Sequence, residues 1–448
     1  MSESFDLVVI GSGSAGSAVA GRCQRAGWRV AMVDERPFGG TCALRGCDPK
    51  KVLVGIAEAV DATRRLRGHG IEGDSRVDWP SLMAFKRSFT DPYPARKERG
   101  LRDAGIEIVH GQARFSGPTT ITAGDRTLNA RYFVIATGAK PAPLDVAGAD
   151  LIATSDDFLE LPELPKRVVF VGGGFISFEF AHVAARAGST VTILHKGDQP
   201  LQRFDPDLVA ALVRHTREVG IDVRTNLEVT AIERSGDEFV VATKNANGAE
   251  RFTGDLVVHG AGRVPAVADL EPMAAGIAYT NRGIEVNEFL QSTSNPQVFA
   301  AGDAAARGPA LTPVAGYDGR VVAHNLLNGP SEKANYPAVA SVVFTIPPLA
   351  SVGLLESDAR RQGLDIDVHT GDMSEWYSSR RLGERAAGYK TIVERGSGRL
   401  VGAHVFGPHA SETINLFALA LSAGITVRQL KESFFGYPTG ASDVQYML

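Results

Sequence analysis

Two segments of this 448-residue chain share one pattern of hydrophobic and polar positions. In the first segment, the apolar run 7–10 ends at Gly11, a helical stretch follows, and a second apolar run, 28–33, ends at Asp34. The segment 167–194 repeats this order of apolar run, glycines, helical stretch and apolar run. Each segment therefore predicts a strand, a tight turn, a helix and a parallel strand.

The glycines of the first segment have the spacing of a dinucleotide-binding loop, G-x-G-x-x-G. Gly11 allows the tight turn, Gly13 lets the backbone approach a pyrophosphate at the helix N-terminus, and Gly16 lets the helix lie close to the strand. Asp34, at the end of the second strand, can accept hydrogen bonds from a ribose. We therefore predict a dinucleotide cradle at this place.

The second segment predicts a second cradle. Gly172 and Gly174 take the first two glycine positions, and Ser177 stands at the third. Two cradles in one chain predict two bound nucleotides.

The second cradle has no acid at the end of its second strand. His195 stands at the position that corresponds to Asp34, Lys196 follows it, and Arg203 lies seven positions farther on. A carboxylate would repel a 2′-phosphate, whereas cationic side chains can pair with one. We therefore expect NADPH rather than NADH; the alternative is that Lys196 and Arg203 merely face water.

Residues 39–50 carry two cysteines, Cys42 and Cys47, five positions apart. On a regular helix this offset places the Cα atoms roughly 8–9 Å apart, whereas a disulfide needs less than about 7 Å. The segment must bend if the thiols are to pair, and Gly46 and Pro49 permit or force bending. A disulfide in bent backbone is easily reduced, as catalytic disulfides are. The alternative is a pair of unbonded, buried cysteines.

The composition argues against several other kinds of protein. Cys23 is the only further cysteine, so a zinc site with four ligands is not expected. The formal net charge of −4 argues against a nucleic-acid partner, and no apolar run approaches the roughly 18 residues of a membrane span. The N-terminus has no basic leader, so we expect a cytoplasmic protein.

With two cradles and a dithiol directly after the first, the chain resembles the flavoprotein disulfide reductases. These are the group of glutathione reductase, dihydrolipoamide dehydrogenase and mercuric reductase, and the resemblance covers nearly the whole chain. Electrons could pass from a nicotinamide through a flavin to the disulfide, because each of these groups transfers two. Further segments similar to family motifs are ATG at 136–138, GRVP at 262–265, VFAAGDA at 298–304 and LTPVA at 311–315.

The resemblance implies an α/β fold with two Rossmann-like domains and a C-terminal α+β dimerisation domain. The FAD-binding domain would comprise residues 1–148 and 278–335, the NAD(P)-binding domain 149–277, and the dimerisation domain 336–448. Beyond residue 336 the sequence itself reads as β-rich, with an apolar helix at 412–423. A homodimer is expected, in which the C-terminal tail reaches the partner's active site.

The resemblance also implies roles for individual residues. Cys47 would face the flavin as the charge-transfer thiolate, and Cys42 would be the interchange thiol that attacks the substrate. Lys50 matches the lysine near flavin N5, Glu179 matches its ion-pair partner, and Phe175 matches the aromatic gate over the flavin. Lys50 follows Cys47 by three positions, and nearby lysines stabilise thiolates.

FAD and NADPH are the cofactors that the resemblance implies. Asp303 would bind the flavin ribityl chain, while Leu311 and Thr312 would begin the helix beneath the pyrimidine ring. The full set of expected cofactor-binding positions is Gly11, Gly13, Gly16, Asp34, Thr41, Lys50, Ala113, Thr137, Gly138, Gly172, Gly174, Phe175, Ile176, Glu179, His195, Lys196, Gly262, Asp303, Leu311 and Thr312.

The chain departs from the family near its C-terminus, where residues 437–443 read YPTGASD. Tyr437 replaces a histidine, and Ser442, next to Asp443, replaces the glutamate that together with this histidine handles protons for the interchange thiol. Tyrosine has a pKa near 10 against about 6.5 for histidine, so Tyr437 can donate a proton but is a poor base at neutral pH. Lys97 stands where glutathione reductases have a substrate-contacting tyrosine.

These features predict an oxidoreductase that passes electrons from NADPH through FAD to the Cys42–Cys47 disulfide. A small disulfide or thiol-type molecule would be the final acceptor, and Tyr437 is a candidate acid. One alternative is a metal-ion or quinone reductase that lacks the histidine base. Another, of a different class, is a redox-sensing or structural flavoprotein with little turnover.

Overall fold

The computed structural model describes residues 3–448, which form two compact units. The first unit consists of the chain up to Lys50 together with Phe85–Ala142 and Arg263–Tyr336. The second consists of Lys51–Ala84, Pro143–Gly262 and Pro337–Leu448. The division into three domains expected from the sequence stays a prediction.

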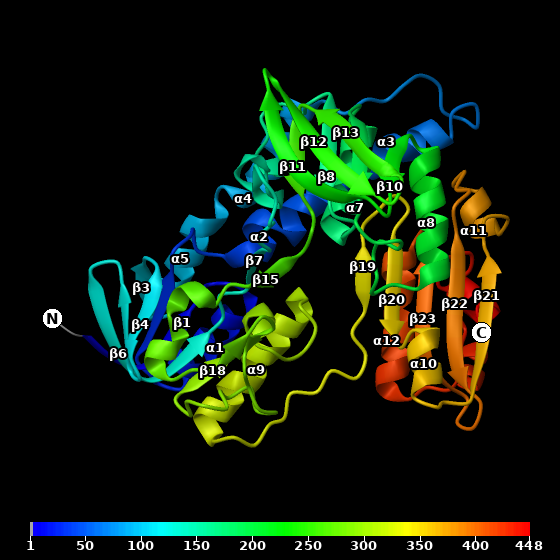
Figure 1. Ribbon diagram of the computed structural model, residues 1–448. Coiled ribbons are helices and arrows are strands. Elements are labelled where there is room, and N and C mark those ends of the chain that lie inside the picture. The colour runs from blue at the N-terminus through cyan, green and yellow to red at the C-terminus, as the bar shows by residue number, and fades with distance from the viewer. Residues whose placement is uncertain (1–2) are drawn as a thin grey trace. The chain divides into compact units, whose positions relative to one another are not determined.

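The first unit contains the sheet of the first cradle (Figure 1). Its parallel strands lie in the order β3-β2-β1-β6, with β18 pairing to the end of β6. Their bounds are β1 (Glu3–Ile10), β2 (Val30–Asp34), β3 (Glu107–His110), β6 (Arg126–Ile135) and β18 (Val298–Ala300). Residues 7–10 of β1 are all buried, because a strand inside a parallel sheet is covered on both faces. The predicted run is thereby confirmed.

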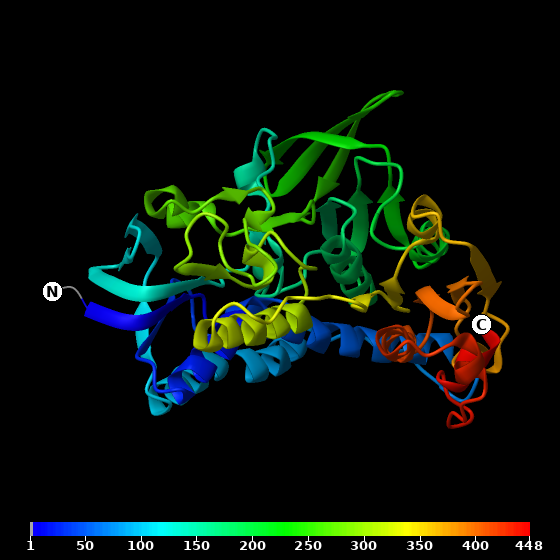
Figure 2. The ribbon, with the colours of Figure 1, turned by 90° about the horizontal axis from the view of Figure 1, so that it is seen from below.

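Two antiparallel strands and several helices complete this unit. Strands β4 (Ala113–Gly117) and β5 (Thr120–Ala123) extend the sheet from the first half of β6. Helix α1 (Ser14–Arg25) lies alongside α9 (Thr312–Asn328), and Figure 2 shows the two as neighbours. A Cβ atom on Gly319 of α9 would lie 2.6 Å from the Ala15 carbonyl oxygen, so glycine is needed for this close approach.

Four helices follow the first cradle along the chain, and two of them cross the division between the units. The helices are α2 (Gly40–Arg45), α3 (Cys47–Arg65), α4 (Trp79–Thr90) and α5 (Tyr93–Asp103). Both α3 and α4 begin in one unit and end in the other.

The second unit contains the second cradle, as the repeat in the sequence predicts. Its parallel sheet has the order β10-β9-β8-β14. The elements are β8 (Arg167–Val171), α7 (Phe175–Arg186), β9 (Thr190–Leu194), α8 (Pro206–Glu218), β10 (Ile221–Arg224) and β14 (Leu256–His259). An antiparallel meander is formed by β11 (Glu228–Ser235), β12 (Glu238–Asn245) and β13 (Gly248–Gly254).

The C-terminal part of the second unit is an antiparallel sheet packed with helices, which confirms the β-rich prediction. The strand order is β19-β20-β23-β22-β21. The strands are β19 (Ser341–Val343), β20 (Leu349–Gly353), β21 (Ile366–Asp372), β22 (Gly388–Glu394) and β23 (Arg399–Phe406). The apolar helix expected at 412–423 is α12 (Ala410–Ala423).

Short elements connect these parts. They are β7 (Ala139–Pro141), α6 (Ser155–Phe158), β15 (Arg263–Pro265), β16 (Tyr279–Thr280), β17 (Gly283–Ile284), α10 (Glu356–Arg361), α11 (Tyr377–Arg380) and α13 (Val427–Lys431). Among the described helices, none is both long enough and apolar enough to cross a bilayer.

Candidate active site

The first cradle is shaped by glycines and by its acid. Gly11 has φ +106°, and a Cβ there would lie 2.3 Å from the Ala136 carbonyl oxygen, so only glycine fits. Asp34 accepts hydrogen bonds from the Ser12 backbone nitrogen (2.8 Å) and hydroxyl (2.6 Å). The same hydroxyl accepts one from the Gly39 nitrogen (2.9 Å). The acid of the cradle therefore also fixes the glycine loop and the residue that precedes α2.

The dithiol segment bends at Gly46, as predicted. Helix α2 ends at Arg45, Gly46 has φ −143° and ψ −117°, and α3 starts at Cys47. A Cβ on Gly46 would lie 2.9 Å from the Thr41 carbonyl oxygen, so a side chain would push the two helices apart. Pro49 does not bend the chain, because it lies in the first turn of α3, where proline is tolerated.

The two thiols of this segment differ in proton affinity. Both are free, and the Cys42 thiol donates a hydrogen bond to Cys47, which lowers the pKa of Cys47 to about 6. The Thr312 hydroxyl, 3.3 Å from the Cys47 sulfur, and the charge of Lys50 lower this pKa further, against the effect of burial. The same hydrogen bond, followed by burial, raises the pKa of Cys42. At neutral pH, Cys47 is therefore the thiolate and Cys42 the thiol.

Three other predicted catalytic or gating residues lie on two helices. Lys50 is buried in α3, and Glu179 is buried in α7, where it accepts a hydrogen bond from the Phe344 nitrogen (2.8 Å). Phe175 begins α7 and is half exposed. Lys50 and Glu179 belong to different units, and their ion pair stays a prediction.

In the second cradle, the residues expected to bind a 2′-phosphate have other partners. His195 accepts a hydrogen bond from the Gly173 nitrogen on Nδ1 (3.1 Å) and donates one from Nε2 to the Gln199 carbonyl (3.0 Å), so both ring nitrogens already have partners. Lys196 forms an ion pair with Glu228 at 2.6 Å. His195 thus stabilises the glycine loop, and Lys196 already has a carboxylate partner.

Arg203 is the remaining cation of this group. It is exposed, and no carboxylate of the described residues pairs with it. Its guanidinium is available for a phosphate.

An aspartate that sequence reasoning missed supports the expected flavin segment. Asp318 of α9 is fully buried and accepts hydrogen bonds from the Gly302 nitrogen (3.0 Å) and the Tyr336 hydroxyl (2.9 Å). Burial raises its pKa to about 6. It thereby fixes the backbone beside Asp303, whose pKa burial also raises. A polar residue at an inward position of an amphipathic helix was the available signal, but its partners come from distant segments.

The first cradle fits a bound dinucleotide. The Thr137 hydroxyl oxygen is buried without a hydrogen-bond partner among the described residues, as expected for a group that contacts a ligand. A Cβ on Gly40 would lie 2.5 Å from the Gly13 Cα, so the start of α2 closes onto the glycine loop. The remaining expected positions keep their roles as predictions. In the first unit they are Gly16, Thr41, Ala113, Gly138 and Leu311, and in the second Gly172, Gly174, Ile176 and Gly262.

The C-terminal segment leaves its tyrosine accessible. Tyr437 is 82% exposed, and the bond from it to Pro438 is cis. Ser442 donates its hydroxyl hydrogen bond to the Thr439 carbonyl (2.6 Å). His404, a conceivable substitute base, is a core residue bonded to Ser351 (2.7 Å), and burial lowers its pKa.

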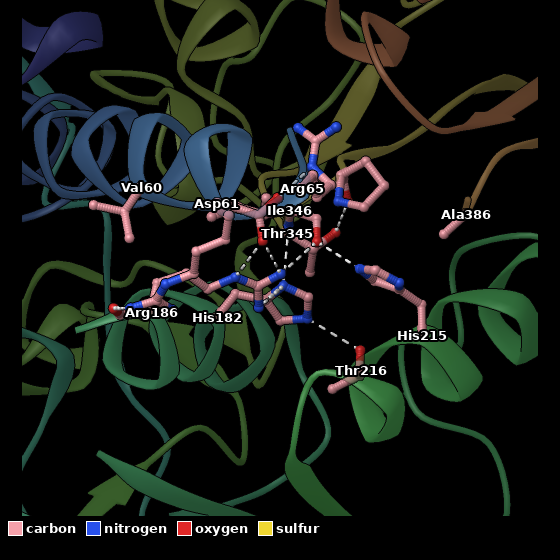
Figure 3. Close-up of polar contacts among 12 residues, drawn as sticks. Val60, Asp61, Arg65, His182, Arg186, His215, Thr216, Thr345, Ile346 and Ala386 are labelled. Atoms are coloured by element: carbon pink, nitrogen blue, oxygen red, sulfur yellow. Dashed lines mark hydrogen bonds and ion pairs between the residues drawn. The ribbon is translucent and has the colours of Figure 1, made fainter. Parts of the chain in front are cut away.

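A buried polar cluster, which no sequence pattern predicts, joins α3, α7 and α8 (Figure 3). Arg186 pairs with Asp61 at 3.0 Å and donates to the Ile346 carbonyl at 3.1 Å. His182 accepts from the Ile346 nitrogen at 3.1 Å and bonds the Thr216 hydroxyl at 3.0 Å. Through these hydrogen bonds the cluster holds the backbone of Ile346 against α7, the helix that contains Glu179.

Comparisons with known proteins agree with this geometry. A family model described as pyridine nucleotide-disulphide oxidoreductase matches residues 5–319, and the dimerisation domain of that family matches residues 339–448. Glutathione reductase of Burkholderia cepacia is 34% identical over 442 residues, which cover 98% of this chain and 97% of that protein. Mercuric reductase of Streptomyces lividans is 32% identical over 448 residues, covering 98% and 94%.

A solved structure shares the fold over nearly its whole length. The Cu(II) complex of the HOCl-induced flavoprotein disulfide reductase RclA from Escherichia coli has a TM-score of 0.89 and 28% identity, and the match covers 99% of each chain.

The chain therefore belongs to the pyridine nucleotide-disulphide oxidoreductase family. It is an oxidoreductase of the FAD-dependent kind that uses NAD(P)H, and it carries a redox-active cysteine pair. The expected fold class is confirmed, and the dimerisation domain supports a homodimer.

Proposed function

We propose that this enzyme passes electrons from NADPH through FAD to Cys42 and Cys47 and on to a small disulfide or related thiol-type acceptor. The observation that carries the proposal is the setting of the dithiol: the Cys47 sulfur lies 3.3 Å from the Thr312 hydroxyl, and the hydrogen bond from Cys42, this hydroxyl and the charge of Lys50 lower the pKa of Cys47, whereas the pKa of Cys42 is raised. This is the distribution that the two roles require, because a thiolate faces the flavin while the other thiol exchanges with substrate.

FAD, when bound in the first cradle, supplies the two-electron relay between the nicotinamide and the disulfide. The protein's own part is to bind and orient. Gly11 and Gly13 let the backbone approach the pyrophosphate. Asp34 accepts hydrogen bonds from a ribose, and Asp303 binds the ribityl chain. Thr312 and Lys50 hold negative charge on Cys47.

NADPH specificity, in this proposal, rests mainly on Arg203. Its guanidinium can pair with a 2′-phosphate bidentately, whereas Lys196 must first release Glu228. At the end of its second strand, the second cradle has His195 instead of an acid that would repel the phosphate.

Metal-ion reduction is a second candidate. The observation that favours it is Tyr437, since the disulfide reductases of the resembling family use a histidine at this place and a metal ion needs less help with protons. One similar relative is a mercuric reductase, and the similar solved structure is a Cu(II) complex.

An acceptor panel tests these functions. NADPH oxidation would be measured with a disulfide, a quinone, Hg(II) and Cu(II), in wild type, Cys42→Ser and the matched control Cys23→Ala, whose thiol is buried in α1. We expect disulfide turnover that is lost in Cys42→Ser and retained in Cys23→Ala. Turnover with metal ions alone would favour the second candidate, and negligible turnover with every acceptor would indicate a sensing or structural flavoprotein.

A further inference from the structure

We propose that Asp48 is the proton acceptor and donor of the interchange thiol Cys42, in place of the base that this chain lacks at position 437. The inference rests on the proposed disulfide chemistry. Asp48 is in the first turn of α3, directly after Cys47. An Asp48 carboxylate oxygen lies 4.0 Å from the Cys42 sulfur, so the thiol can turn its proton from Cys47 to this carboxylate.

The state of Cys42 creates the need for a base. Its thiol holds the proton at neutral pH, because the hydrogen bond to the Cys47 thiolate and burial both raise its pKa. A thiol must become a thiolate before it can attack a disulfide. Tyr437 is a poor base at this pH, and His404 is locked in the core. Asp48 is the carboxylate in contact with the sulfur that must lose the proton.

The surroundings of Asp48 suit this task. Cys42 faces it from α2, Cys47 and Lys50 lie on its own helix, and the Thr312 hydroxyl approaches the sulfurs from α9. Partial burial raises the pKa of Asp48, which makes it a stronger base than an ordinary aspartate. The residue is nevertheless exposed, so an acceptor can reach the same place.

The proton balance of the oxidative half-reaction is complete with Asp48. The Cys42 S–H bond breaks, and the proton moves to Asp48. The Cys42 thiolate attacks the acceptor R–S–S–R, an S–S bond to Cys42 forms, and one RS⁻ leaves, which takes the proton from Asp48 to become RSH. The Cys47 thiolate then attacks the Cys42 sulfur, the internal disulfide forms again, and the second RS⁻ leaves.

A merely structural role makes different predictions. An acid in the first turn of a helix stabilises it through the helix dipole, and such a role would not alter the pH dependence of turnover. The test is therefore the pH profile of disulfide turnover in holoenzyme, compared with the rate of flavin reduction by NADPH in single turnover. Variants would be Asp48→Asn, Asp48→Glu and, as matched control on the same helix, Glu58→Gln.

We expect Asp48→Asn to lower kcat with a disulfide by ~10²-fold, the lower range for general acid–base catalysis. Flavin reduction by NADPH should stay unchanged, and the acid limb of the profile should move to higher pH, because Cys42 must then ionise unaided. Asp48→Glu should recover most of the rate, and Glu58→Gln should match wild type. An unchanged profile in Asp48→Asn, or an equal loss in flavin reduction, would overturn the proposal. Full disulfide turnover in Cys42→Ser would instead overturn the proposed function.

Discussion

Cys42 and Cys47 have identical side chains, yet their surroundings give them opposite proton affinities. Cys47 receives hydrogen bonds from Cys42 and Thr312 and feels the charge of Lys50, so its pKa falls to about 6. The Cys42 thiol donates a hydrogen bond to the Cys47 thiolate and is partly buried, so the pKa of Cys42 rises. This difference supports the flavin-facing role proposed for Cys47 and the interchange role proposed for Cys42, both of which stay predictions.

The ionisation of Cys47 should be visible in the absorbance spectrum of the reduced enzyme. A thiolate is present above its pKa and is protonated below it, so the long-wavelength charge-transfer band of two-electron-reduced enzyme should grow as pH rises through about 6. Cys47→Ser should abolish the band. Thr312→Val should move the midpoint up by about one pH unit, since a hydrogen bond to a charged group is worth ~1.5 kcal/mol, whereas Thr312→Ser should not. A band that survives in Cys47→Ser would contradict the assignment.

At the scale of elements, both cradles and the β-rich C-terminal part were predictable because each rests on a local pattern. The run 7–10 and the glycines after it define β1 and its turn without reference to distant residues. Contacts between distant segments could not be predicted. Glu228, which neutralises Lys196, comes from β11, and the contact of Asp48 with Cys42 depends on the angle that the chain takes at Gly46.

Substitutions of Arg203 and Lys196 in the second cradle should change the preference for NADPH over NADH. Arg203→Ala should raise KM for NADPH by about tenfold, the equivalent of one charge-assisted hydrogen bond, and leave KM for NADH unchanged. Lys196→Ala should have a smaller effect, because Glu228 already holds that ammonium group. Steady-state kinetics with both coenzymes measure this. Equal catalytic efficiency of the wild type with NADPH and NADH would refute the preference.

Breaking the buried cluster of α3, α7 and α8 should lower the unfolding free energy more than breaking an exposed ion pair. Arg186→Met leaves the buried carboxylate of Asp61 with one fewer cation and should cost about 3 kcal/mol of unfolding free energy. Arg224→Met, which breaks an exposed pair with Asp222, should cost less than about 1 kcal/mol. Chemical denaturation of both variants compares the two losses. Equal losses would show that the cluster adds no particular stability.

At the scale of the whole molecule, the exposed aromatic residues near the C-terminus fit a dimer. Phe434, Tyr437 and Tyr446 are all strongly exposed in a single chain, and they follow the dimerisation sheet. Exposed apolar groups of this kind commonly mark an interface. In the dimer that the family resemblance predicts, Tyr437 would reach the partner's dithiol, where its hydroxyl would donate to the second leaving thiolate, which Asp48 does not protonate.

Substitutions of Tyr437 test that role. Tyr437→Phe should slow disulfide turnover, by up to ~10²-fold, and leave flavin reduction by NADPH intact. Tyr437→His should raise disulfide turnover at neutral pH, because it supplies a base. Gel filtration would verify that both variants remain dimers. Unchanged rates in both intact variants would exclude a chemical role for this position.

The most direct test of the whole account is an anaerobic titration of the oxidised holoenzyme with NADPH, with thiols counted by alkylation and located by mass spectrometry. If electrons pass to the dithiol, one equivalent of NADPH per subunit exposes two new alkylatable thiols, at Cys42 and Cys47, while the flavin returns to its oxidised state with a charge-transfer band. Reduction of the flavin without new thiols at these two cysteines would contradict the transfer of electrons to the dithiol.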